Sequence, residues 1–99
     1  MKYLLQGKLI AKSGHQEALI DIMNRASKLM LSKAKGCELY AVGSSHEDIN
    51  VVFITEIWAS KEDHELSLSV EGVKELIAEA MPILSSPPQK GLEINVLNL

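Results

Sequence analysis

Side chains able to do acid–base chemistry gather where an apolar run ends and a polar, helix-compatible run begins. Glu56 and Trp58 close the run over residues 50–58, and His64 and Ser67 follow, three residues apart on one helix face. Histidine, with an ordinary pKa of about 6.5, can accept or donate a proton at neutral pH, and tryptophan offers an apolar ring with one N–H donor. The grouping predicts a small-molecule pocket. Taken alone, His64 between two acidic residues is typical of an exposed helical position. Trp58 is as typical of a residue packed in a dimer interface as of a residue in a pocket.

Motifs for other chemistries are missing from the sequence. There is no glycine-rich nucleotide or phosphate loop, no serine elbow before a helix, and no Cys–Cys or His–His pair at metal-ligand spacing. The histidines at 15, 46 and 64 are dispersed. We therefore expect neither a metal nor a cofactor.

Charge and composition limit the kinds of molecule that the protein is expected to bind and the compartment in which it is expected to work. Ten basic and thirteen acidic side chains give a net charge of −3, which argues against nucleic acids and anionic membranes as partners. No apolar run approaches the roughly 20 residues that span a bilayer, and the apolar start breaks too early for a signal peptide. The single Cys37 excludes an intramolecular disulfide. We expect a cytoplasmic protein.

Helix signals appear twice. Ser13, with Gln16 three residues later, has the capping-box pattern, and apolar residues then recur every three or four positions until a stop at Gly36. A second helix is predicted to begin at Ser60, to break near a central glycine and to end at Pro82.

The strand signals complete an α+β domain over residues 1–99. The predicted strands cover residues 3–11, 37–43, 50–58 and 92–97. The order β-α-β-β-α-β predicts a ferredoxin-like fold, with a four-stranded antiparallel sheet and both helices on one face.

The third strand predicts an oligomer, because both of its faces are apolar. Val52, Ile54, Glu56 and Trp58 share one face, and the alternate residues from Val51 share the other. The helices cover one face, and a second copy of the chain is the simplest cover for the other. Glu56 and Trp58 are expected on the face turned away from the helices. The alternative is a hydrophobic strand with a wet outer face.

Three short segments resemble the antibiotic biosynthesis monooxygenase family, whose members include quinol monooxygenases. They are residues 11–17 (AKSGHQE), 36–40 (GCELY) and 56–64 (EIWASKEDH), and the resemblance extends from Gly7 to Leu84. The resemblance implies a dimeric α+β barrel. It also implies oxygenation of a small electron-rich hydroxylated aromatic, such as a quinol, by O₂ without a metal, flavin or haem.

The resemblance also implies roles for individual residues. Trp58 would pack on the substrate ring, His64 would act as the base, and Glu56 or Tyr40 would orient the substrate. The remaining predicted substrate-binding residues are Ser67, Ile54 and Val52. Many family members carry a histidine at the position of Ser67, one helical turn beyond His64.

Two alternative functions stay open at this stage. The first is a non-catalytic barrel that binds a small hydrophobic ligand. The second is haem binding or degradation, which ranks last because the haem-degrading members use an asparagine on the first strand, where this chain has Gln6, and a histidine farther beyond the tryptophan.

Overall fold

The computed structural model describes all 99 residues and confirms the ferredoxin-like order, with the second helix in two parts. The strands are β1 (Lys2–Ile10), β2 (Cys37–Ser44), β3 (Val51–Trp58) and β4 (Gln89–Val96). The helices are α1 (Gln16–Lys33), α2 (Lys61–Ser67) and α3 (Val73–Ala80), and a 3-10 turn follows at Met81–Ile83. The strand bounds shift by a few residues from those predicted, most of all for β4.

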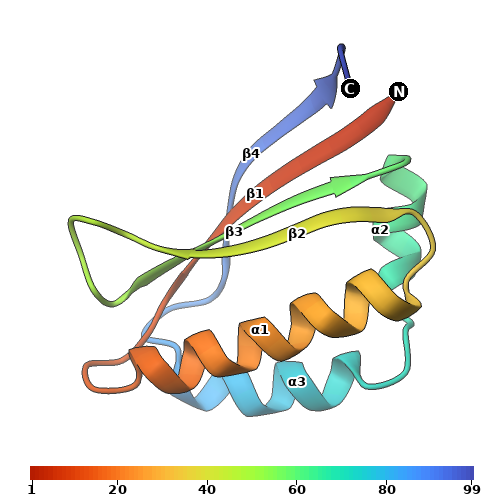
Figure 1. Cartoon of the computed structure of the whole chain (residues 1–99). Coiled ribbons are helices and arrows are strands. Elements are labelled where there is room, and N and C mark those ends of the chain that lie inside the picture. The colour runs from red at the N-terminus through yellow and green to blue at the C-terminus, as the bar shows by residue number, and fades with distance from the viewer.

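The four strands form one antiparallel sheet in the order β2-β3-β1-β4. Figure 1 shows α1 and α3 side by side beneath this sheet and α2 at one end of it. The two central strands are β1 and β3, and Tyr3 of β1 lies opposite Trp58 of β3. Opposite residues of an antiparallel pair share a face, so this register aligns the functional side chains of the two strands.

The core fills the space between the sheet and the helices. One cluster joins Leu19 and Ile22 of α1 to Val52 and Ile54 of β3. A second cluster holds Tyr3, Met30, Trp58 and Val73. Trp58 is fully buried, so the prediction that Glu56 and Trp58 face away from the helices is wrong. Alternation along a strand defines two faces, but only packing decides which of them meets the helices.

The helix starts were predicted with mixed success. Ser60 caps α2 as predicted, because its hydroxyl accepts a hydrogen bond from the Asp63 amide at 3.1 Å. The Ser13 cap is wrong. Gly14, at φ 84°, closes a turn in which the His15 amide donates to the Lys12 carbonyl, so α1 begins at Gln16 without a side-chain cap.

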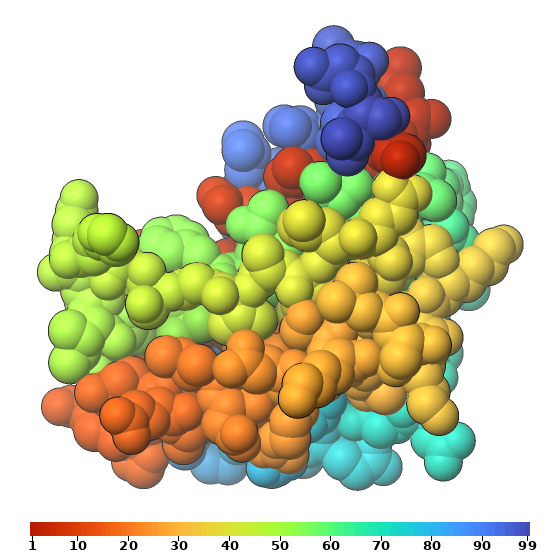
Figure 2. Space-filling model, viewed as in Figure 1, coloured from red at the N-terminus to blue at the C-terminus, as the bar shows by residue number.

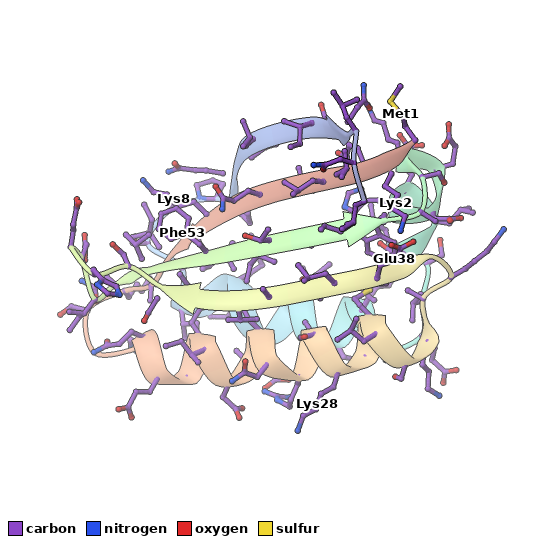
Figure 3. The ribbon with its side chains drawn as sticks, turned by 45° about the horizontal axis from the view of Figure 1, so that its top comes forward. Met1, Lys2, Lys8, Lys28, Glu38 and Phe53 are labelled. Atoms are coloured by element: carbon purple, nitrogen blue, oxygen red, sulfur yellow. The ribbon has the colours of Figure 1, made fainter.

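The other face of the sheet is uncovered and partly apolar. Leu39, Leu92 and Ile94 are exposed on it by 40%, 51% and 41%. In Figure 3 this face is turned toward the viewer, and Phe53 lies beside Lys8, its partner in the β1–β3 register. No helix of the chain is long and apolar enough to cross a membrane.

Candidate functional site

A cleft of about 570 Å³ opens between the helix-facing side of the sheet and α2. Its walls come from all four strands, from α2 and from Met23 of α1, and they include Leu5, Tyr40, Ile54, Glu56, His64 and Lys90. Figure 2 shows the opposite flank, where the atoms of α1 lie directly against those of β2, so that flank is closed. The cleft therefore places residues from four strands and two helices around one space.

Glu56 and His64 form the polar centre of the cleft. His64 Nε2 lies 3.8 Å from Glu56 Oε1, and their side chains are only 23% and 12% exposed. The same Glu56 oxygen accepts a hydrogen bond from the Trp58 indole N–H at 3.0 Å. The His64 ring stands edge-on to the Trp58 ring at a centroid distance of 5.6 Å. The hydrogen bond from buried Trp58 therefore fixes the position of the Glu56 carboxylate from the side of the core.

Burial acts on both members of the pair. It raises the pKa of Glu56 above its ordinary value, and the hydrogen bond from Trp58 partly opposes this shift. Burial also lowers the pKa of His64. In each case burial disfavours the charged form, so the acid and the base are brought closer in proton affinity. Such a pair can pass a proton to or from a bound ligand.

Tyr40 and Ile54 line the same cleft. Burial, followed by the nearby Glu56 charge, raises the pKa of Tyr40. The Tyr40 phenol therefore keeps its proton at neutral pH and can donate it in a hydrogen bond. Ile54 supplies an apolar wall of the cleft.

The other predicted site residues lie behind the surface of the cleft. Trp58 and Val52 are fully buried and line no cavity. Neither the Trp58 ring nor the Val52 methyl groups therefore contact the cleft. Ser67 is also buried, and its hydroxyl donates to the His64 carbonyl at 2.5 Å. Ser67 borders a smaller apolar cavity that adjoins the cleft.

The polar mouth of the cleft was not predicted from the sequence. The Tyr3 hydroxyl donates to Glu93 Oε2 at 2.5 Å, and Lys90 and Lys61 lie 3.1 Å and 3.6 Å from the same oxygen. Burial and the bond to Glu93 raise the pKa of Tyr3 to about 12. Tyr3 and Glu93 meet only because β4 pairs with β1. No local sequence motif predicts this long-range pairing.

Titratable side chains do not form a metal centre. No group of three or more His, Cys, Asp or Glu residues stands close enough together to hold a metal ion.

Comparisons with known proteins point to one family. The sequence model of the antibiotic biosynthesis monooxygenases matches residues 3–79. A Chloroflexus aurantiacus protein provisionally assigned to that family is 30% identical, with 100% of this chain and 94% of that chain covered at a TM-score of 0.78. No curated protein sequence matches.

More distant solved structures share the fold. A Nitrosomonas europaea protein with the same provisional assignment superimposes at a TM-score of 0.91, with 11% identity over 98% of this chain and 91% of that chain. A conserved Methanosarcina mazei protein superimposes at 0.85, with 14% identity over 95% and 91% of the two chains.

Proposed function

Because the chain belongs to the antibiotic biosynthesis monooxygenase family, we propose that it oxygenates a small, electron-rich, hydroxylated aromatic with O₂ and without a metal, flavin or haem. The observation that carries the proposal is the partly buried Glu56–His64 pair at the centre of the cleft. The pair offers a proton acceptor beside apolar walls able to hold a ring.

The substrate itself would supply the reducing electrons. Neutral His64 takes the proton of a ring hydroxyl, or of the carbon beside it, and the resulting anion passes one electron to O₂. Recombination of the two radicals forms a C–O bond at a ring C–H carbon and gives a hydroperoxide, in which the former hydroxyl is a C=O group. When the hydroperoxide loses water, the C–H and O–O bonds break and that ring carbon becomes C=O. One oxygen atom enters the product and the other leaves as water. The protein binds the ring, accepts the proton and limits water at the intermediates.

Tyr40 and Glu56 have separate roles in this scheme. The protonated Tyr40 phenol donates a hydrogen bond to the oxygen that develops negative charge. Glu56, held by Trp58, faces His64 Nε2 and stabilises the imidazolium that forms when the proton arrives.

Oxygen consumption tests the function. Purified protein is mixed with a reduced naphthoquinol in the presence of a chelator, and the autoxidation rate without protein is subtracted. We expect uptake well above that rate, and a His64→Gln variant should lose most of it. His15→Gln is the matched control, since His15 directly precedes α1 and lines no cavity.

Binding without turnover would favour the second function, a ligand-binding barrel. The Trp58 ring contacts His64, and Trp58 is the single tryptophan, so a bound aromatic should change its fluorescence. Saturable quenching by a panel of hydroxylated aromatics, with no uptake of O₂ for any of them, would contradict the oxygenase and leave the binding function.

We also propose that two copies pair through the uncovered face of the sheet. An apolar row crosses this face, because the register of the four strands places Leu39, Ile57, Leu4 and Ile94 opposite one another. An exposed apolar surface of this kind marks an interaction site. Sedimentation at micromolar concentration should give a dimer, and Ile94→Lys should give the monomer. Leu66→Lys, at an exposed position on α2, should leave the dimer intact. A monomeric wild-type protein would refute the pairing.

A further inference from the structure

A second cavity, of about 210 Å³, lies between the sheet, α1 and α3. Its walls are almost entirely apolar, and include Met23, Leu76, Ile77, Ala80, Met81 and Leu84. We call this cavity the apolar chamber.

The apolar chamber is continuous with the cleft. Tyr40, Glu56 and His64 line both spaces, as do Leu9 and Met23. A molecule held at the Glu56–His64 pair therefore stands at the entrance of the chamber. Ile77 and Met81, which also line the chamber, are 48% and 49% exposed, so part of its wall forms an apolar rim at the surface.

Beyond the residues that it shares with the cleft, the chamber has no polar side chain without a partner. Its polar side chains are Tyr40, Glu56 and His64 at the entrance and Ser67, whose hydroxyl is already bonded to the His64 carbonyl. The two buried side-chain atoms that lack a partner, on Gln16 and Ser86, do not line it. Water needs polar partners to occupy a cavity, so a space of this kind favours an apolar occupant.

We propose that the apolar chamber binds an aliphatic chain attached to the hydroxylated ring of the substrate. The inference rests on the proposed function for the placement of the ring, and it narrows the substrate class to alkyl- or alkenyl-substituted phenolic rings. At about 30 Å³ per water-sized group, the chamber holds a chain of about seven carbons.

A homologous series of 4-alkylphenols, from methyl to decyl, measures the chamber directly. The dissociation constant of each is determined by calorimetry with the wild-type protein. We expect each added methylene to lower it about fourfold until the chain reaches about seven carbons, and to have little effect thereafter. A dissociation constant that does not depend on chain length would overturn the inference.

Two variants shorten the chamber, and one serves as their control. Ala80→Leu fills its buried wall, and Ile77→Phe narrows its exposed rim, so the second remains informative if the first folds poorly. Both should move the plateau to shorter chains. Ile49→Phe, at a 66% exposed position outside the chamber, should leave the plateau unchanged. An unchanged plateau in Ile77→Phe would also overturn the inference.

The binding series separates this inference from the oxygenase function, because none of its measurements requires turnover. Chain-length dependence with no O₂ uptake would support the chamber and remove the oxygenase. Uptake with a short-chain quinol but no chain-length dependence would support the oxygenase and remove the chamber.

Discussion

The hydrogen bond from Trp58 to Glu56 offers the sharpest test of how the site is held. Trp58→Phe keeps an aromatic ring in the core but removes the N–H that lies 3.0 Å from Glu56 Oε1. Losing a hydrogen bond to a charged group costs about 2 kcal/mol. The smaller ring, at a fully buried position, adds about 1 kcal/mol for the space it leaves. We therefore expect the free energy of unfolding to fall by about 3 kcal/mol.

A double-mutant cycle with Glu56→Gln isolates the contribution of the carboxylate. The glutamine amide oxygen still accepts from the indole, but a neutral hydrogen bond contributes only about 1 kcal/mol. Trp58→Phe should therefore cost about 1 kcal/mol less in the Glu56→Gln variant than in the wild type. Phe53→Leu, on the opposite face of β3, should be additive with Glu56→Gln.

The pH dependence of Glu56→Gln has a defined sign. Burial raises the pKa of Glu56 in the folded protein above its unfolded value, so the folded state holds that proton to higher pH. Wild-type stability therefore declines as pH rises through the folded pKa, whereas the glutamine has no proton to lose. The stability of the variant relative to the wild type should increase as pH rises above about 4.5.

Urea unfolding supplies the free energies, with all variants at one protein concentration because dimerisation would add to stability. Additive effects of Trp58→Phe and Glu56→Gln at neutral pH would refute the claim that the indole holds a charged carboxylate. A relative stability of Glu56→Gln that falls with rising pH would refute the effect of burial on Glu56.

Three further predictions concern the surroundings of the site. Gly36→Ala should destabilise the protein more than Gly14→Ala. Both glycines have positive φ, but only at Gly36 would the new Cβ collide with a neighbour, the Asp63 side chain. Thermal unfolding of the two variants measures the difference. Ser60→Ala should cost about 1 kcal/mol by removing the cap of α2, which chemical denaturation would show, and no change in the midpoint would contradict the cap. Because burial lowers the pKa of His64, kcat/KM for O₂ uptake should stay level down to about pH 6.5 and fall below it. A decline centred above that pH would exclude neutral His64 as the base.

Patterns within short stretches of the sequence predicted most of the fold. The order of helices and strands along the chain, the break in the second helix and the Ser60 cap follow from residues close together in the sequence, and the structure confirms them. Periodicity also grouped Glu56 with Trp58 on one strand face. These features depend on short-range sterics and hydrogen bonds, which the sequence states directly.

Long-range packing decided what the sequence could not. The face of β3 that meets the helices depends on how Met30 and Val73 pack on Trp58. Trp58, which was predicted to pack on the substrate ring, is therefore buried in the core, where its indole N–H donates a hydrogen bond to Glu56. The contact of Tyr3 with Glu93 likewise exists only after β4 has paired with β1. No spacing rule links residues so far apart.

The position of β1 bears on how the chain reaches this fold. β1 comes first along the chain yet lies inside the sheet, and Lys2 pairs with Val96 near the other end. The β2–β3 hairpin can form early because its loop is short, whereas joining β1 to β4 closes a loop of nearly the whole chain. Such non-local pairing slows folding, and it leaves one edge of β1 unpaired until β4 has been synthesised. During translation that edge is open to pairing with a wrong strand.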